Sequence, residues 1–600
     1  MSYTGPAGYE RARDEASAHV ASQEDSEKKE ELLFLRTVDQ RPYFPLLKVD
    51  PNDEDTVLNA ANIIVKAYHD IHSCNNNNDD NNSDATAPKG KVTVIVGGLT
   101  NALYKVDLPS NYFLTPASSA APLSLSSSPT TTSSTSSSTT TTSVLVRIFG
   151  AEGLIDRDVE SSDFAALCSA RPNILHSQLN FVGRFANGRV ETWISNMRPA
   201  RYLEDLQPEK LQLEENTDGE EVATNEANNN DYGLMLEVAR QMARLHYGLN
   251  DDNTSSSFTD SNKDDEPSLW KVTQGWIDEL SAHFANPKLF QHYSNETKDN
   301  DVELLTKLFL RATLLQNDHS TTSTTATSTS TSATSDPTPA WDKASQQIIQ
   351  HLSNELSWLK TQVEHQFPNA PIVFCHNDVN AANILLDTTV VDVAEDPTEE
   401  DGDNNTQQKS QHNHHSRYND QSVAIIDYEY GSVNYAMFDV ANFNCEHCGG
   451  LDSGVPNYAE LMPSEVRKRM FLKEYVRERD LMLASKKQKG ELVAVNGAKE
   501  EDDREEDEII TNLSSQVELF ELASHFYWGT WGILQSTLEV MDGTFVTPNI
   551  AIERLEGKAE TMNSWDNLRY GKTRLEWYWI CKERVVLAAK KEKEEDGGGL

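Results

Sequence analysis

The sequence predicts an α+β protein of two lobes, in which an antiparallel β-sheet is followed by a larger helix-rich part. Two observations lead to this expectation. Short β-branched segments bounded by turn residues gather before residue 195, and segments with apolar residues three and four positions apart dominate after it. Long low-complexity segments interrupt both parts, so the packed core is smaller than a length of 600 residues implies.

The first lobe is expected to contain short strands at 92–96, 102–106, 144–149, 180–185 and 190–194. Asn187 and Gly188 join the last two strands, and Asn-Gly is a strong hairpin signal because it tolerates positive φ at both positions. A Ser/Thr tract at 116–143 takes the place of a hairpin turn between the strands at 92–96 and 144–149. The expected product is an antiparallel sheet.

The second lobe is expected to contain long helices, because apolar residues recur there with helical spacing. The segments with this spacing are 234–245, 270–284, 344–366, 464–484 and 517–540. The expected organisation is a disordered N-terminal segment at 1–40, a first lobe at 41–195, a second lobe at 196–590 and a disordered tail at 591–600.

Six segments lack the apolar area needed to offset the cost of ordering the chain, so they are expected to be surface loops or disordered. They are the tracts 75–86, 116–143, 214–231, 318–336, 392–421 and 486–508.

The chain is strongly acidic, with 95 Asp and Glu against 52 Lys and Arg, a formal net charge of −43. This charge argues against a nucleic-acid partner, whose phosphates would be repelled, and suits a cationic substrate. No run of about twenty apolar residues is present, so no stable membrane insertion is expected, and the N-terminus has no apolar stretch suited to a signal peptide.

The six cysteines are scattered without a framework pattern and indicate reduced thiols in a cytoplasmic protein. Cys445 and Cys448 form a C-x-x-C pair, but a single pair supplies only half of a zinc site.

The most informative motif lies between two apolar strands of the second lobe. His376, Asp378 and Asn383 follow the pattern H-x-D-x-x-x-x-N, by which a kinase catalytic loop places a hydroxyl-activating aspartate near a metal-binding asparagine. A second apolar strand ends in Asp427, where a second magnesium-binding carboxylate of a kinase lies. Together with the order of the two lobes, these residues predict a bilobal, protein-kinase-like fold and phosphoryl transfer from ATP with Mg²⁺.

A glycine-rich turn between two strands of the first lobe is the expected nucleotide site. Backbone without Cβ atoms can approach phosphate closely, and its amides can point at the phosphate oxygens. Arg147, on a later strand, occupies the position of a kinase's phosphate-pairing lysine, and residues 191–194 are expected to offer backbone groups to adenine. The turn contributes four residues expected to bind the cofactor: Gly97, Gly98, Thr100 and Asn101.

Six motifs in order resemble the signature segments of the choline/ethanolamine kinase family, over about residues 92 to 582. They lie at 97–101, at 145–150 with 155–158, at 374–383, at 426–430, at 435–442 and at 523–531. The resemblance implies a cytosolic, magnesium-dependent kinase that phosphorylates a small amino alcohol at the start of phospholipid synthesis.

The resemblance also implies residue roles. Asp378 matches the catalytic base, with Asn383 beside it, and Asp427 and Asn383 match the metal-binding positions. Four residues match positions that line the amine pocket: Glu446, Trp528, Trp531 and Tyr578. Trp528 and Trp531 are three residues apart, so their rings share a helix face and can attract one cation. The segment 442–444 departs from the family's Asn-His-Phe, which bears on the geometry of the pocket wall.

Ethanolamine is the expected substrate, because the segments 155–158, 374–378 and 445–450 look closer to ethanolamine kinases. The product would be phosphoethanolamine, formed in the first step of the CDP-ethanolamine route to phosphatidylethanolamine. Choline kinase is the alternative, and another small-molecule kinase of the same superfamily also stays open. A protein kinase would show D-F-G and A-P-E motifs, and a pseudokinase would lack Asp378 or Asp427. The sequence leaves the oligomeric state open, a homodimer included.

Overall fold

The computed structural model describes residues 35–36, 41–72, 90–95, 101–108, 142–150, 157–170, 174–201, 205–206, 232–248, 266–289, 338–391, 418–419, 421–449, 456–487, 499–542 and 567–597. The chain divides into two compact units. The first draws on Met1–Arg198, Leu386–Asp403 and Asn419–Gly431, and the second on Pro199–Leu385, Asn404–Tyr418 and Ser432–Leu600. The segment that carries Asp427 therefore belongs to the first unit, although its sequence position suggested the second lobe.

The first unit is built on a seven-stranded sheet of order β1-β2-β6-β7-β5-β4-β3. The strands are β1 (Leu35–Arg36), β2 (Pro42–Phe44), β3 (Lys91–Ile95), β4 (Asn101–Leu108), β5 (Thr142–Phe149), β6 (Phe181–Phe185) and β7 (Gly188–Thr192). The five predicted strands are confirmed as β3 to β7. Every neighbouring pair is antiparallel except β2 and β6, which run parallel and which the sequence pattern does not indicate.

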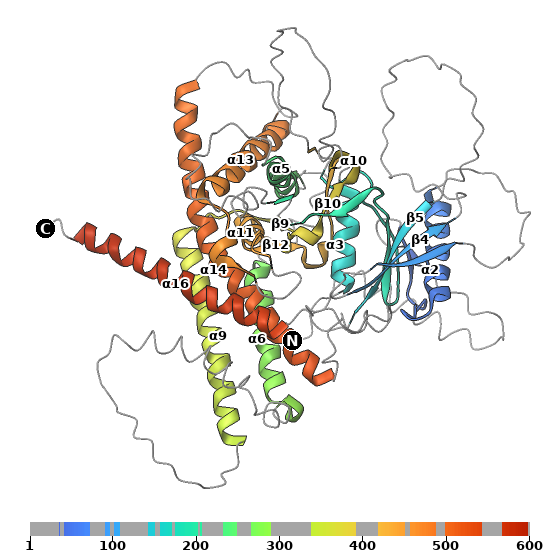
Figure 1. Ribbon diagram of the computed structural model, residues 1–600, viewed down its shortest axis with the longest axis horizontal. Helices are drawn as coiled ribbons and strands as arrows, with labels where there is room; N and C mark the ends of the chain where they lie inside the picture. The colour runs from blue at the N-terminus through green and yellow to red at the C-terminus, as the bar shows by residue number, and fades with distance from the viewer. Residues whose placement is uncertain are drawn as a thin grey trace, which may run out of the picture. The chain divides into compact units, whose positions relative to one another are not determined.

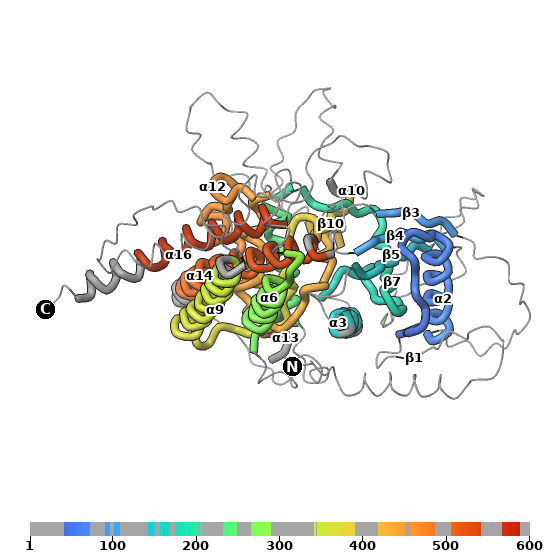
Figure 2. Tube along the Cα trace, turned by 90° about the horizontal axis from the view of Figure 1, so that it is seen from below, coloured from blue at the N-terminus to red at the C-terminus, as the bar shows by residue number. Residues whose placement is uncertain are grey.

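Two helices lie on opposite faces of this sheet, α2 (Glu54–His72) and α3 (Arg157–Ala170) (Figures 1 and 2). The apolar stripe of α2 is formed by Val57, Ala61, Ile64 and Tyr68, at helical spacing. All four are buried in the core that the sheet forms with this helix. Neither helix is among those that the sequence pattern predicts.

The second unit is mainly helical. Its helices are α5 (Gly233–Gly248), α6 (Ser268–Phe284), α9 (Thr338–Gln366), α11 (Ala436–Glu446), α12 (Tyr458–Leu461), α13 (Glu465–Lys487), α14 (Lys499–Asp542) and α16 (Asn567–Gly597). The five predicted helices fall on α5, α6, α9, α13 and α14, whereas α11, α12 and α16 were not predicted.

Two small sheets carry the segments with the predicted catalytic residues. β9 (Ile372–Cys375) pairs antiparallel with β12 (Ser432–Tyr435). β10 (Ile384–Asp387) lies between β11 (Val423–Ile425) and β8 (Met197–Pro199).

The charged run at 486–508 is not wholly a loop, because α14 begins at Lys499. Lys and Glu favour helix, and the apolar remainder of α14 provides an established helix to which further turns add at little cost. An ion pair between Arg469 and Asp507 (Nη2 to Oδ1, 2.6 Å) connects this part of α14 to α13. At the other end of the chain α16 continues to Gly597, so helix covers most of the expected tail at 591–600.

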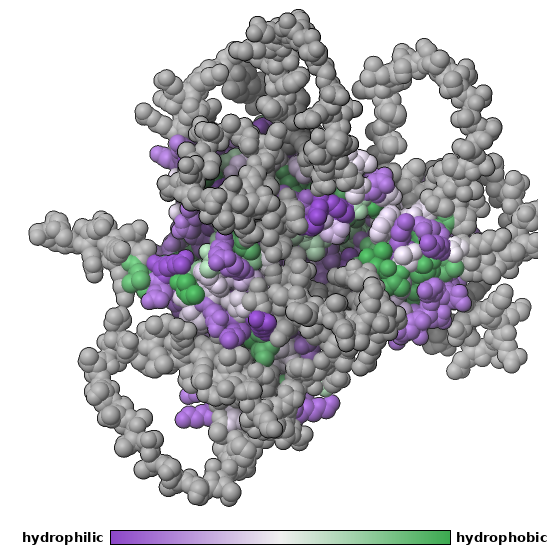
Figure 3. Space-filling view, viewed as in Figure 1, coloured by the Kyte–Doolittle hydropathy of each residue, from purple (hydrophilic) through white to green (hydrophobic). Residues whose placement is uncertain are grey.

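In the part of the chain that the structure describes, no helix combines the length and the apolar character needed to span a membrane. Polar and apolar side chains are mixed on the coloured surface in Figure 3, and apolar atoms appear along α16, where Ile580 and Leu587 are exposed.

Three glycines allow α14 and α16 to approach closely. A Cβ at Gly532 would lie 2.8 Å from the Cα of Gly571, and a Cβ at Gly571 would lie 2.9 Å from the carbonyl oxygen of Gly529. Both distances are too short for real Cβ contacts, so only glycine permits this spacing. The contact determines which side chains of α16 face α14.

We expect Gly571→Ala to destabilise the protein by about 1–3 kcal/mol, because the new methyl group must push two backbones apart. Urea unfolding of the full chain measures the change. Gly275→Ala in α6 is the matched control, because a Cβ there meets no atom within 4 Å. Alanine at this exposed helix position should instead stabilise the protein by about 0.5–1 kcal/mol. Equal effects of the two substitutions would contradict the close helix contact.

Candidate active site

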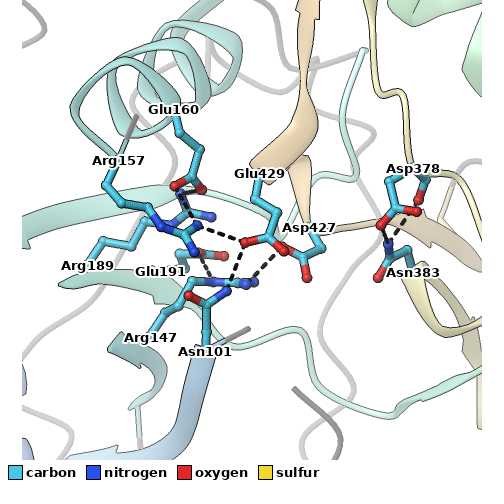
Figure 4. Close-up of polar contacts among 10 residues, drawn as sticks. All are labelled: Asn101, Arg147, Arg157, Glu160, Arg189, Glu191, Asp378, Asn383, Asp427 and Glu429. Atoms are coloured by element: carbon cyan, nitrogen blue, oxygen red, sulfur yellow. Dashed lines mark hydrogen bonds and ion pairs between the residues drawn. The ribbon is translucent and has the colours of Figure 1, made fainter. Parts of the chain in front are cut away.

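The turn after β9 presents Asp378 with its carboxylate held on both sides. Asn383 Nδ2 donates to Asp378 Oδ2 (3.1 Å) and to its carbonyl oxygen (2.9 Å), and Asn380 Nδ2 donates to Asp378 Oδ1 (3.1 Å). Asn380 also caps the short 3-10 helix η2 (Ala381–Asn383) by accepting from the backbone N–H of Asn383. The predicted pair of Asp378 and Asn383 is thus in direct contact (Figure 4).

Asp439 of α11 holds this turn from beneath. Its fully buried carboxylate accepts from the backbone N–H of His376 (2.7 Å to Oδ2) and of Asn377 (2.5 Å to Oδ1). Asn377 has left-handed backbone (φ 66°), which is uncommon for a residue with a side chain. Asn434 Nδ2 donates to Asn377 Oδ1 (2.8 Å) and helps to retain that conformation.

Asp439 also belongs to a buried group with His246 and Cys375, whose side chains approach closely enough to share a metal ion. His246 Nε2 lies 3.1 Å from Asp439 Oδ2, and His246 Nδ1 lies 2.7 Å from the hydroxyl of Tyr475. Because both oxygens of Asp439 already accept backbone N–H groups, we interpret the group as polar support of the catalytic turn. The sequence motifs assign no role to these three side chains, which support the backbone of the motif residue His376 through Asp439.

In the first unit, Asp427 follows β11 and has left-handed backbone (φ 67°). Its Oδ1 accepts from Arg147 Nη1 (2.8 Å), and Arg147 Nε donates to Glu191 (3.2 Å). Arg147 is buried, and its predicted partner, a phosphate, would have to replace Asp427. The side chain of Glu191, in the segment expected to face adenine, is occupied by ion pairs.

This ion-pair network continues through four further charged residues and Asn101 (Figure 4). Arg189 pairs with Glu191 (2.6 Å) and Glu160, and Arg157 pairs with Glu160 (3.2 Å) and Glu429 (2.8 Å). Asn101 Nδ2, expected to bind the cofactor, donates to Glu429 (3.0 Å). The other predicted cofactor residues, Gly97, Gly98 and Thr100, lie outside the described residues.

The network suits a bound cation. Three guanidiniums face four carboxylates, which leaves one net negative charge when all are ionised. Burial raises the pKa of Asp427 to about 6, Arg147 opposes this, and Glu429 adds to it. A hard divalent cation prefers carboxylate oxygens and would relieve this excess charge. Glu429, to which the sequence motifs assigned no role, is a second carboxylate two residues after Asp427 and in the same network.

An aromatic group lies on α14 and α16 of the second unit. The rings of Trp528 and Trp531 are 5.5 Å apart and nearly perpendicular (74°), and Trp531 meets Tyr570 edge-on at 6.1 Å. The charge of Asp378 contributes to the raised pKa of Tyr570 and of Tyr527, for which burial is the main cause. The predicted base and the two predicted tryptophans belong to the same unit.

Glu446 lies at the end of α11 beside the same group. Its Oε1 accepts from Arg574 Nη2 (2.5 Å), and Tyr570 is a further hydrogen-bond partner. The altered segment before it is firmly held, since Ser524 donates to Asn442 (2.8 Å) and Asn444 donates to Glu521 (3.0 Å). The replacement of the family's histidine leaves α11 a regular helix.

Tyr578 has different contacts. It is fully buried, its hydroxyl donates to Glu355 (2.5 Å), and its ring contacts Phe526 and Trp579. Tyr570, two helical turns earlier on α16, is the tyrosine that contacts Trp531. Sequence analysis missed Tyr570, and a spacing of eight residues on one helix face could not distinguish the two tyrosines.

The C-x-x-C pair lies around the end of α11. Cys445 and Cys448 are buried with Tyr458 in an apolar cluster, and burial raises the pKa of both thiols. In the described ranges they form no cluster with a third ligand.

Comparisons with known proteins agree on one family. The family model described as choline/ethanolamine kinase matches residues 92–579. "Probable choline kinase 3" of Arabidopsis thaliana is 24% identical over 40% of this chain and 47% of its own length. "Choline/ethanolamine kinase" of Rattus norvegicus is 27% identical over 32% of this chain and 38% of its own length. "Ethanolamine kinase 2" of Mus musculus is 24% identical over 40% and 41%, respectively. The chain thus spans less than half the length of each of these relatives.

Among solved structures, a choline kinase from Cryptosporidium parvum has a TM-score of 0.43 and 19% identity, covering 83% of this chain and 91% of its own. An ethanolamine kinase from Plasmodium vivax has a TM-score of 0.41 and 16% identity, covering 82% and 81%.

We expect Mg²⁺ to stabilise the protein at about pH 7.5 and to lose this effect at about pH 5, because Asp427, with a pKa of about 6, must be ionised to bind it. Without the cation, the contribution of Asp427 to stability changes with pH in the opposite direction. The pKa lies above its ordinary value in the folded state, so the contribution of Asp427 to stability falls as pH rises from about 4 to about 6.

Thermal unfolding with and without Mg²⁺ at both pH values measures the effect, and Asp427→Asn should abolish it. Asp107→Asn is the matched control, because the exposed fraction of its side chain is similar (23% against 24%) and it lies in the same unit. A stabilisation by Mg²⁺ that survives in Asp427→Asn would contradict the assignment.

Proposed function

The chain belongs to the choline/ethanolamine kinase family, and on that premise we propose that it transfers the γ-phosphoryl group of ATP to the hydroxyl of a small amino alcohol. One observation supports this most strongly. A carboxylate oriented by two amides, Asp378, belongs to the same unit as an aromatic group whose Tyr570 contacts both Trp531 and Glu446. An amino alcohol needs both features, a base for its hydroxyl and a cation site for its ammonium group.

In the proposed reaction Asp378 orients the substrate hydroxyl and accepts its proton. The hydroxyl oxygen bonds to the γ-phosphorus while the bond to the bridging oxygen breaks, and ADP leaves. Asn383 and Asn380 fix the direction of the carboxylate through their N–H groups, so little reorganisation is needed when the hydroxyl arrives.

The residues proposed to bind Mg²⁺ and the phosphates of ATP are assigned from their chemistry and from the family resemblance. Asp427 would hold Mg²⁺, with Glu429 supplying further negative charge, and the ion when bound would balance the charge of the phosphates. The metal-binding role of Asn383 rests on the family resemblance. Arg147, released from Asp427, would then pair with a phosphate oxygen. The roles of Gly97, Gly98 and Thr100 rest on the family resemblance.

Ethanolamine is the proposed substrate and phosphoethanolamine the product, in the first step of the CDP-ethanolamine route and in the cytoplasm. A primary ammonium needs hydrogen-bond acceptors for its N–H groups. The carboxylate of Glu446 and the hydroxyl of Tyr570 supply such acceptors. Choline stays a second candidate, because the rings of Trp528, Trp531 and Tyr570 suit a quaternary ammonium.

We expect Asp378→Ala to lower kcat by about 10²-fold or more, because a positioned base is lost, while ATP still binds. Steady-state kinetics and ATP titration measure the two effects. Asp278→Ala, which removes an exposed carboxylate of α6, is the control and should leave kcat unchanged. Near-normal turnover in Asp378→Ala would rule out its role as base.

We expect Glu446→Gln to lower kcat/KM for ethanolamine much more than for choline, because only the primary ammonium donates N–H groups to the carboxylate. Trp531→Ala should lower kcat/KM for both amines, since it removes a ring face that either cation uses. Steady-state kinetics of both variants with both amines measure these changes in kcat/KM, and circular dichroism checks that the variants fold. A wild-type preference for choline of tenfold, about 1.4 kcal/mol, would replace ethanolamine by choline as the substrate.

A further inference from the structure

A buried positive charge lies beside the proposed amine site, and the chemistry above does not use it. Arg574 of α16 is fully buried. A guanidinium keeps its proton at every relevant pH, so a buried one needs a compensating negative charge. The carboxylate bonded to it is that of Glu446, 128 residues away in sequence, with Oε1 at 2.5 Å from Arg574 Nη2.

The guanidinium is held from three sides. Arg574 Nε donates to the hydroxyl of Tyr570 (3.0 Å), and Nη1 lies 3.3 Å from His525 Nδ1. Because arginine can only donate, His525 Nδ1 is the acceptor and the ring proton sits on Nε2. His525 Nε2 can then donate to the sulfur of Cys445, at 3.6 Å. The direction of Arg574 is therefore set by groups on α11, α14 and its own helix.

Glu446 is the member of this cluster whose charge is open to change. Burial raises its pKa, and Arg574 is the main opposing influence. The pKa of His525 lies well below its ordinary value through burial, so its ring stays neutral. Burial also raises the pKa values of the surrounding hydroxyl and thiol groups, Tyr458, Tyr570, Cys445 and Cys448. The charge of Asp378 adds slightly to the raised pKa of Tyr570.

We propose that Arg574 is a positioning residue that keeps the carboxylate of Glu446 ionised and directed at the ammonium group of the substrate. This inference rests on the proposed function. Arg574 itself stays away from the ammonium, because its N–H groups are committed to Tyr570, His525 and Glu446. Glu446 is thus a carboxylate prepared in advance, which spares the substrate the cost of deprotonating a buried acid.

The first test is the pH dependence of kcat/KM for ethanolamine between about pH 6.5 and 8.5, where the amine stays protonated. Wild type should change less than about twofold. Arg574→Met should be impaired at the lower pH and recover by about tenfold or more at the higher pH, as Glu446 loses its proton. Arg574→Lys, which keeps a positive charge, should restore the flat profile, and KM for ATP should stay within about twofold throughout.

The second test does not depend on activity. In Arg574→Met the pKa of Glu446 rises further above its ordinary value in the folded state, so stability relative to wild type should fall as pH rises from about 5 to 8. Thermal unfolding across this range measures the trend, and Arg574→Met with Glu446→Gln should remove it. The double variant also shows whether the fold survives without the ion pair.

The possible outcomes distinguish a failure of this inference from a failure of the proposed function. A uniform loss of activity in Arg574→Met with an unchanged pH profile, or a stability difference that does not vary with pH, would overturn the inference and leave Arg574 a purely structural residue. If wild type phosphorylates neither ethanolamine nor choline, the proposed function fails, and the stability series still decides whether Arg574 controls the charge of Glu446.

Discussion

The carboxylate of Asp439 is the constraint on which the turn that carries Asp378 depends. Two successive backbone N–H groups, those of His376 and Asn377, converge on it, and this requires Asn377 to take left-handed backbone. That conformation costs about 1–2 kcal/mol for a residue with a Cβ. Each hydrogen bond to a charged acceptor contributes about 1.5–3 kcal/mol, so the two bonds outweigh the strain. The next residue, Asp378, is thereby directed out of the core toward its two asparagines.

The first unit shows a different arrangement of charge. Buried ion pairs stabilise little on balance, because removing charges from water costs about as much as their attraction returns. A network of seven charged side chains around Arg147 and Arg189 is therefore hard to explain by stability alone. Its excess negative charge, centred on Asp427 and Glu429, is better explained as preparation for a cation. The second unit has a comparable balance at Glu446, where the buried Arg574 offsets the charge of the carboxylate that we propose binds a cationic substrate.

Features encoded within a few residues could be predicted from sequence. The sequence spacing of Asp378 and Asn383 predicts that their side chains meet, and so does the spacing of Trp528 and Trp531; both contacts are present. Strands β3 to β7 and five helices of the second unit followed from periodicity in the same way. The charged start of α14 could not be predicted, because its composition is that of a loop. It is helical because the adjoining apolar part of α14 extends into it.

Contacts between distant segments could not be predicted in this way. The choice between Tyr570 and Tyr578 depends on how α16 sits against α14, which the glycine contact at Gly532 and Gly571 determines. The pairing of Arg574 with Glu446 and the support from Asp439 join helices far apart in the chain. No local pattern marks such partners, since they follow from packing of the whole unit.

Phosphorus NMR of the purified full-length protein with ATP, Mg²⁺ and equal amounts of ethanolamine and choline tests the central claim most directly. The account predicts the growth of a phosphomonoester signal from an amino alcohol at the same rate as ADP appears. ADP and inorganic phosphate without a phosphorylated amine, or ATP left intact over hours, would contradict it.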